Sequence, residues 1–158
     1  MPIPVYHYTT GDRFLRIIAS RAILPATAHV NPPEIPAFWL SSAPVWEPSA
    51  TKGVIEDGVR RQASLAELIV LCGCLVRIEI DPARVWLLGL SAFRAALRIP
   101  DVVHDRLLAA GLKMGANPTD WSAVAGTVPL TAFRRIEFTV EADPPQWISW
   151  PGFRSRVR

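Results

Sequence analysis

The chain has 158 residues, of which half are hydrophobic and a fifth are charged, and it carries a formal net charge of +3. This length suits a single domain, residues 1–158, with a sizeable core, and the composition excludes a disordered chain. The positive charges are spread out, which excludes the dense basic stripe of a nucleic-acid surface, although one or two arginines suffice for a phosphate-bearing small molecule.

The sequence offers no segment for a membrane. Its longest apolar run, residues 68–76, is too short to span a bilayer and is interrupted by Gly73. The first residues lack the charged and apolar regions of a secretory signal. We therefore expect no membrane partner, and a location in the cytoplasm or export by a route that needs no signal peptide.

The N-terminal part predicts a strand, a helix and a second strand. Residues 3–8 are β-branched and aromatic, which favours a strand, and Thr10-Gly11-Asp12 suits a helix start. Phe14, Ile17 and Ile18 then give the apolar face of a helix that ends near residue 21. Residues 26–36, with three prolines, predict a loop, and residues 37–41 predict a buried strand.

The middle of the chain predicts an irregular segment and then a strand. Prolines and glycine or aspartate breakers in residues 43–59 indicate an excursion with one helical turn at most. Residues 64–71 predict a short helix or the approach to a strand, with Ser64 as N-cap and Glu67 completing a capping box. Residues 75–80 alternate apolar and charged side chains, as a half-buried strand does.

The C-terminal part predicts further helices and one more strand. Residues 91–97 and 101–110 have helical patterns, and residues 118–124 suggest another helical turn. Residues 133–140 alternate like a strand, and the segment with Trp147 and Trp150 is a short strand or a packed loop. Strands and helices are mixed without a βαβ repeat, so the predicted class is α+β.

Two cysteines and three histidines leave little scope for a metal. Cys72 and Cys74 have no cysteine or histidine partner at metal-ligand spacing, so we predict no metal site and two small buried side chains. His29 and His104 are expected at the surface. Common nucleotide and hydrolase motifs, GxGxxG, GxxxxGK[ST], HExxH and GxSxG, are absent.

Three segments remain that could carry chemistry: YHYTT around His7, FWLSS at residues 38–42, and RRIEFTV around Glu137. In this order they resemble the ADP-ribosyltransferase superfamily, in its histidine-bearing branch of diphtheria-toxin and poly(ADP-ribose) polymerase types. There an early strand carries His-x-Thr before a helix, a middle strand carries an aromatic residue and then serine or threonine, and a late strand carries a glutamate. The resemblance implies a split mixed or antiparallel β-sandwich core with peripheral helices.

The resemblance also implies that NAD is the co-substrate, bound in a cleft between two small sheets. His7 would bind a ribose hydroxyl of the adenosine half, and Thr9 would fix its strand. Tyr8 or Trp39 would supply an aromatic face near the nicotinamide, and Ser41 would support the middle strand.

Glu137 takes the role of catalytic carboxylate in this resemblance. Breaking the bond between ribose and nicotinamide builds positive charge on the sugar, and one preorganised electrostatic partner is typically worth about 3–4 kcal/mol. Residues 77–80 echo residues 135–138, so Glu79 remains an alternative carboxylate. For both glutamates, a structural ion pair with the arginine two residues earlier also stays open.

Further contacts with the co-substrate are hypotheses on individual residues. Arg13 and Arg16, at the start of the first helix, are placed to approach the pyrophosphate. Trp46 is a candidate wall of the cleft, and Lys52 a candidate phosphate contact.

The resulting hypothesis is an NAD-dependent ADP-ribosyltransferase, toxin- or effector-like, that acts on a protein or nucleic-acid acceptor and has an antitoxin or immunity protein as partner. The absence of a Glu-x-Glu motif argues against transfer to arginine. Two alternatives stay open: a non-catalytic nucleotide- or protein-binding module, and an RNA-processing enzyme with His7 as general base and Arg134 and Arg135 on phosphate.

Overall fold

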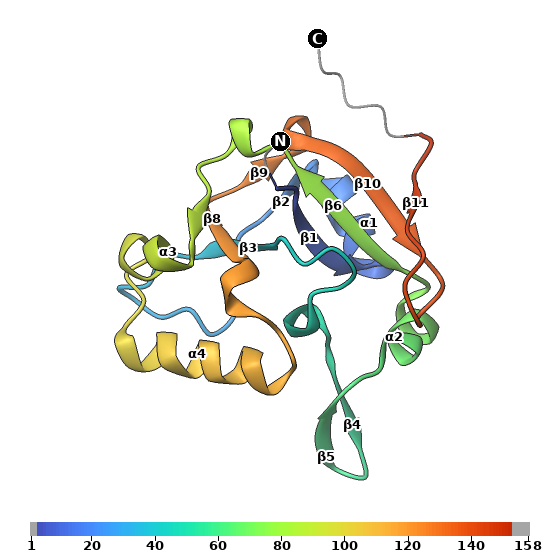
Figure 1. Cartoon of the computed structure of the whole chain (residues 1–158), viewed down its shortest axis with the longest axis horizontal. Helices are drawn as coiled ribbons and strands as arrows, with labels where there is room; N and C mark the ends of the chain where they lie inside the picture. Colours follow the sequence, from blue (N-terminus) through green and yellow to red (C-terminus); the bar gives the residue numbers. More distant parts are fainter. Residues whose placement is uncertain (1–2, 153–158) are drawn as a thin grey trace.

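A single antiparallel sheet organises the protein. The computed structural model describes residues 3–152, and its seven-stranded sheet has the order β11-β10-β6-β1-β3-β8-β7 (Figure 1). All its neighbouring strands pair antiparallel. The protein is therefore a mixed α/β protein with a mostly antiparallel sheet, as the predicted class requires. These seven strands form one continuous sheet, and not two packed sheets as a sandwich would.

The elements alternate irregularly along the chain. The helices are α1 (Gly11–Ser20), α2 (Leu65–Cys72), α3 (Leu90–Ala96) and α4 (Asp101–Lys113). The strands of the large sheet are β1 (Val5–Thr10), β3 (Ala37–Ser41), β6 (Leu75–Ile80), β7 (Leu88–Gly89), β8 (Trp121–Ala125), β10 (Phe133–Thr139) and β11 (Ile148–Ser149). Two further strand pairs are not hydrogen-bonded into this sheet: β2 (Ala22–Ile23) with β9 (Val128–Pro129), and β4 (Gly53–Glu56) with β5 (Val59–Gln62). Short 3-10 helices are η1 (Pro48–Ala50), η2 (Pro82–Arg84), η3 (Pro118–Asp120) and η4 (Leu130–Ala132).

Several predicted elements have the expected bounds. β3 and β6 cover residues 37–41 and 75–80, and β10 ends one residue earlier than predicted. α2 begins with the predicted capping box, in which the Ser64 side chain accepts from the Glu67 amide and the Glu67 side chain accepts from the Ser64 amide. β1 is shifted towards the C-terminus, to Val5–Thr10, and α1 follows it directly.

Two segments differ from the prediction. Of residues 118–124, predicted as a helical turn, Pro118–Asp120 form the 3-10 helix η3. Residues 121–125 form strand β8 instead, because they lie next to β3 with four of their five residues buried. The segment predicted as irregular contains the first strand of the β4–β5 hairpin, which extends away from the sheet (Figure 1). Asp57 and Gly58 at its tip have φ values of 50° and 78°, as a type I′ turn requires, so Asp-Gly was a hairpin signal.

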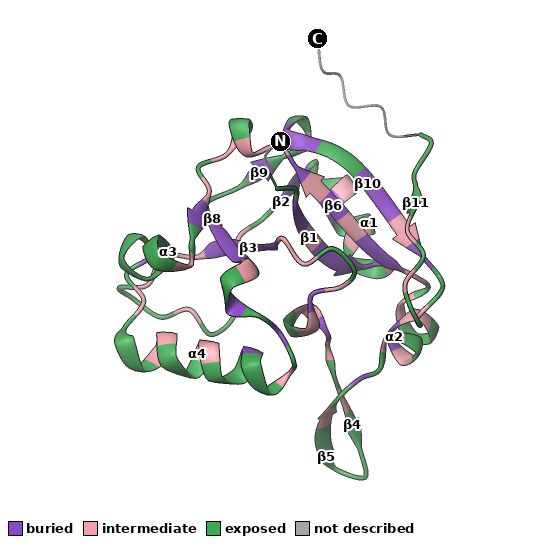
Figure 2. Ribbon diagram, in the orientation of Figure 1, coloured by how far each residue is buried: buried purple, intermediate pink, exposed green. Residues whose placement is uncertain are grey.

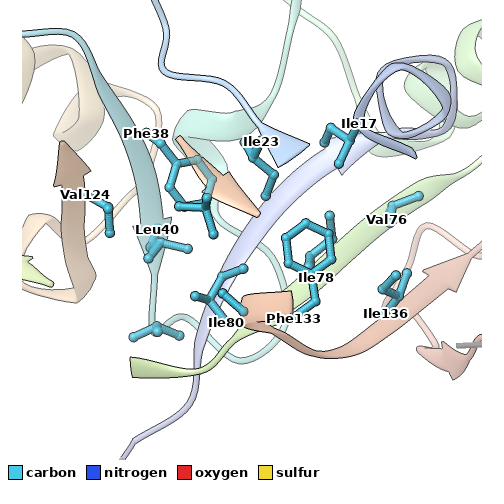
Figure 3. Close-up of a cluster of buried hydrophobic side chains, with 13 residues drawn as sticks. Ile17, Ile23, Phe38, Leu40, Val76, Ile78, Ile80, Val124, Phe133 and Ile136 are labelled. Atoms are coloured by element: carbon cyan, nitrogen blue, oxygen red, sulfur yellow. The ribbon is translucent and has the colours of Figure 1, made fainter. Parts of the chain in front are cut away.

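The main core lies on one face of the sheet, beneath α1. Figure 3 shows side chains from α1, β6 and β10 gathered with Phe38 and Phe133, and Figure 2 shows that the central strands are the most buried part. This cluster includes Val5, Ile17, Ile23, Phe38, Leu40, Val76, Ile78, Ile80, Val124, Val128, Phe133 and Ile136.

The register of the central strands decides which side chains share a face. His7 lies opposite Ile78, which lies opposite Ile136, and both isoleucines belong to the core beneath α1. Tyr8 lies opposite Arg77, which lies opposite Glu137. Because neighbours along a strand point to opposite faces, His7 and Glu137 lie on opposite faces of the sheet.

Helix α4 approaches the sheet through a glycine. A Cβ atom at Gly111 would lie 2.2 Å from Cη2 of the buried Trp121 side chain. Gly111→Ala is therefore expected to lower the melting temperature, because overpacking typically costs about 1–3 kcal/mol and outweighs the gain of about 1 kcal/mol in helix propensity.

The neighbouring position provides the control for this prediction. Ala110 is exposed on the same helix, so Ala110→Gly should destabilise through propensity alone. Thermal unfolding of both variants measures the effect. A more stable Gly111→Ala variant would mean that the indole of Trp121 moves aside at little cost.

Candidate functional site

The sheet opens between β1 and β3, and His7 lies at the opening. The register of these two strands consists of one pair, Tyr6 with Ser41. Beyond it the His7 Nδ1 lies 3.2 Å from the carbonyl oxygen of Trp39. A carbonyl only accepts, so Nδ1 carries the proton and donates, which leaves Nε2 as a hydrogen-bond acceptor.

A cavity of about 770 Å³ lies at this opening. Small-molecule sites typically measure about 300–1,000 Å³, so a ligand of dinucleotide size suits it. Its lining comes from β1, α1, β2, β3, the segment around η1, α4 and the first residue of β8. It includes Tyr6, His7, Tyr8, Thr9, Arg13, Arg16, Ile17, Phe38, Trp39, Leu40, Ser41, Glu47, Ser49, Lys52, Leu107, Gly111, Met114 and Trp121.

Most residues singled out in the sequence line this one cavity. They are His7, Tyr8, Thr9, Arg13, Trp39 and Ser41, together with Arg16 and Lys52. Trp46 is not among the lining residues. Its ring stacks on Trp147 at a centroid distance of 6.4 Å, and its Nε1 donates to the Thr51 hydroxyl.

The cavity carries three cationic side chains. Arg13 and Arg16 come from α1, and Lys52 follows η1. Within residues 3–152, none of the three makes an ion pair with an acidic side chain. Burial and the charge of Arg13 lower the pKa of Lys52, so an anion at this point would relieve an unfavourable crowding of positive charge.

The same environment keeps His7 uncharged. Burial of the ring lowers the pKa of His7 to about 4, and the nearby charges of Lys52 and Arg13 add to this effect. At neutral pH the imidazole is therefore neutral, which suits a hydrogen-bonding role more than one as a charged contact.

The depressed pKa of His7 predicts an acid sensitivity. The unfolded chain takes up this proton near pH 6.5, whereas the folded protein resists it until about pH 4. Stability is therefore fully present above pH 6.5 and is lost as the pH falls towards 4, by at most about 3 kcal/mol. Urea unfolding between pH 7 and 4 measures this loss.

A His7→Phe variant is the control for this prediction. It should show a smaller loss of unfolding free energy over the same pH range, because it has no proton to take up. An identical pH dependence in the two proteins would contradict the assignment to His7.

Glu137 does not lie where the resemblance required it. It is buried, absent from the cavity lining, and its Oε2 lies 2.6 Å from Nε of Arg77. Its Oε1 is 3.7 Å from Nη1 of Arg135. Glu137 does not reach the cavity that holds His7, because the strand alternation turns it to the opposite face of the sheet.

The alternative carboxylate, Glu79, does not line the cavity either. Its Oε2 lies 2.9 Å from Nη2 of Arg135 on the neighbouring strand β10, so its ion-pair partner is not Arg77, the arginine two residues earlier in the chain. Both glutamates of the repeated pattern are thus engaged by arginines.

The carboxylate that does line the cavity is Glu47. It is 5% exposed and accepts three hydrogen bonds: from the Ser41 hydroxyl at 2.7 Å, and from the Ser49 amide and hydroxyl at 3.1 and 2.6 Å. It is also the N-cap of η1. Its sequence signal is weak, because an acid followed by Pro-Ser is typical of a turn and does not by itself indicate a site.

Three side chains hold the segment that leads to Glu47. The hydroxyl of Tyr8 donates to the carbonyl of Ala43, and Arg77 Nη1 donates to that of Pro44 at 2.5 Å. Trp147 Nε1 donates to the carbonyl of Val45 at 2.9 Å. Three consecutive carbonyls are thus fixed by β1, β6 and the segment before β11.

Arg77 is itself held tightly in this arrangement. Its guanidinium carbon lies 4.7 Å from the ring centroid of Tyr6 and 4.7 Å from that of Trp147, while Nε pairs with Glu137. Such contacts with two aromatic faces and a carboxylate leave the side chain little freedom.

No group of three or more histidine, cysteine, aspartate or glutamate side chains within residues 3–152 is placed to hold a metal ion. In the same residues, the helices are too short or too polar to cross a bilayer. No family model, curated protein or solved structure matches the chain.

Proposed function

We propose that the protein is an NAD-dependent ADP-ribosyltransferase with an ADP-ribosyltransferase-like fold, and that NAD binds in the cavity between β1 and β3. The observation that supports this proposal is that one cavity brings together His7, the aromatic ring of Trp39, three cations and a carboxylate. NAD combines an anionic pyrophosphate with a cationic nicotinamide ring, so it matches a site that has both kinds of charge.

The proposed reaction breaks one bond and forms one. The bond between C1′ of the ribose and the nicotinamide nitrogen breaks, and its electron pair leaves with nicotinamide, which becomes neutral. A hydroxyl or amine of a macromolecular acceptor, or water, then bonds to C1′ and releases its proton. The sugar carries positive charge in the transition state, so a fixed carboxylate nearby lowers the barrier.

Each lining residue has a role in this proposal. The Nε2 of His7 accepts a hydrogen bond from a ribose hydroxyl, because its Nδ1 proton is used on Trp39. Arg13 and Lys52, with Arg16, hold the pyrophosphate. The rings of Trp39 and Tyr8 exclude water from the reacting bond. The acceptor is proposed to be a protein or nucleic acid, and a toxin-like role with a neutralising partner protein fits such an activity.

The test measures NAD binding by calorimetry and nicotinamide release with the purified chain. The protein should bind NAD and release nicotinamide slowly, and Lys52→Ala should weaken NAD binding about tenfold or more, because charge-assisted contacts are worth about 1.5–3 kcal/mol. Lys113→Ala is the control, since Lys113 is exposed on α4 and absent from the cavity lining. A folded chain that does not bind NAD, or equal binding by Lys52→Ala, contradicts the proposal.

A second candidate function is a nucleotide-binding module without catalysis. It is favoured by one observation, that Glu137 is paired with Arg77 on the face opposite His7. This candidate predicts NAD binding with no nicotinamide release at any enzyme concentration. Release above the uncatalysed rate would reject it.

A further inference from the structure

We propose that Glu47 is the carboxylate that stabilises the developing sugar cation, and that Arg77 is a positioning residue for it. This inference rests on the function proposed above and assigns to Glu47 the role that the family resemblance implied for Glu137. Four properties of Glu47 support it: its location, its uncompensated charge, its free acceptor site and its fixed backbone.

The first property is location. Among the described residues that line the cavity, Glu47 is the acidic one, and it shares that lining with His7 and Trp39. Glu137 and Glu79 are absent from it. A group that stabilises charge on a bound sugar has to reach it, so neither of those two glutamates can act without a rearrangement of the sheet.

The second property is the charge of Glu47. Its three hydrogen bonds come from uncharged donors, two hydroxyls and one amide. Within residues 3–152, no cationic side chain lies within ion-pair distance of it, whereas Arg77 neutralises Glu137 at 2.6 Å. A buried carboxylate without an ion-pair partner favours a cation directly beside it, whereas Arg13, Arg16 and Lys52 make the rest of the cavity lining cationic.

The third property is a free acceptor site. An ionised carboxylate can accept about four hydrogen bonds. Oε1 of Glu47 accepts two from Ser49, and Oε2 accepts one from Ser41. Oε2 therefore retains a lone pair for a ribose hydroxyl of the bound ligand, while the serines fix the orientation of the carboxylate.

The fourth property is the fixed backbone before Glu47. Arg77 donates to the carbonyl of Pro44, and Tyr8 and Trp147 donate to the carbonyls on either side of it. Electrostatic stabilisation is most effective when the charged group does not reorganise during the reaction. The Arg77–Glu137 pair thus contributes to the site by holding the segment that carries Glu47.

In the proposed step, Glu47 remains ionised throughout and exchanges no proton. Its Oε2 accepts a hydrogen bond from the ribose, and its charge offsets the positive charge that grows at C1′. The electron pair of the broken bond leaves with nicotinamide, and the incoming hydroxyl, amine or water molecule releases its proton to solvent.

The test compares Glu47→Gln with Glu79→Gln, a change in a partly buried glutamate that lies outside the cavity. Glu47→Gln should lower the rate constant for nicotinamide release about 100-fold or more with little change in the Kd for NAD. Glu79→Gln should release nicotinamide at the wild-type rate. Wild-type release by a folded Glu47→Gln variant overturns the proposal and leaves Glu47 as the cap of η1 alone.

The role of Arg77 is tested separately, by comparing the effect of a substitution on kcat with its effect on the KM for NAD. Arg77→Lys, assayed well below its melting temperature, should lower kcat while the KM for NAD stays near the wild-type value, because the pyrophosphate contacts are untouched. If kcat is unchanged, Arg77 does not position Glu47.

A binding measurement separates failure of this inference from failure of the proposed function. The wild-type protein should bind NAD⁺ more tightly than NADH by about tenfold, because only the oxidised ring is cationic, and Glu47→Gln should remove that preference. If the protein binds NAD without releasing nicotinamide, the proposed transferase activity is rejected. The preference for NAD⁺ over NADH still tests whether Glu47 stabilises a positive charge in the cavity. Equal binding of both forms by the wild-type protein overturns the role of Glu47.

Discussion

Replacing Arg77 with alanine is expected to destabilise the protein by about 3–5 kcal/mol, because it leaves the carboxylate of Glu137 buried without a partner. Glu137 is 5% exposed, and the pair of Arg77 Nε and Glu137 Oε2 spans 2.6 Å. The change also removes the guanidinium from between Tyr6 and Trp147 and leaves the carbonyl of Pro44 without its donor. Urea unfolding at pH 7 measures the loss.

A double replacement separates the contribution of the ion pair to stability from that of side-chain packing. Arg77→Met combined with Glu137→Leu removes both charges and keeps much of the volume, so it should recover most of the stability lost in Arg77→Ala. A loss below about 1 kcal/mol in Arg77→Ala would show that water or Arg135, whose Nη1 is 3.7 Å away, compensates Glu137.

Replacing Phe93 with alanine should cost about 3–5 kcal/mol, as is typical for a fully buried aromatic side chain. Phe93 has no exposed surface and belongs to the cluster formed by α3, β7 and β8. Its ring packs edge-on against Trp39 at a centroid distance of 5.1 Å, and the tilted ring of His104 lies at a centroid distance of 5.7 Å. The loss of unfolding free energy is measured by thermal or urea unfolding.

Because Trp39 lines the cavity, Phe93→Ala should also weaken NAD binding. Phe93→Leu is the graded control, and it should lose less stability and less affinity, since it fills part of the space. If Phe93→Ala loses stability and keeps the wild-type Kd for NAD, the position of Trp39 does not depend on this packing.

The elements that sequence patterns predicted well depend on local information. β6 alternates apolar and charged side chains, and the capping box of α2 lies within four consecutive residues, so both patterns can be recognised without knowledge of the rest of the fold. β8 was missed because its first four residues are all buried and show no alternation, and only its position beside β3 gives it a strand conformation.

The candidate site could be predicted only in part, because long-range register decides it. His7, Thr9 and Trp39 were singled out and share one cavity. The alternation of apolar and polar side chains in β10 is visible in the sequence. Which of these side chains share a face with His7 depends on how β10 and β1 each pair with β6, and this register places Glu137 opposite Arg77. Glu47 lies in a segment without periodicity, so its approach to the cavity follows from tertiary hydrogen bonds that no local pattern encodes.

The junction at Tyr6 and Ser41 also has a mechanical consequence. The register of β1 with β6 contains six residue pairs, whereas that of β1 with β3 contains one, supplemented by the bond from His7 to Trp39. Among the strand pairs of the sheet, β1 with β3 therefore has the shortest register. Small relative displacements of the strands on either side cost least there, and they change the width of the cavity. A ligand that contacts the strands on both sides of the junction between β1 and β3 would oppose such displacements.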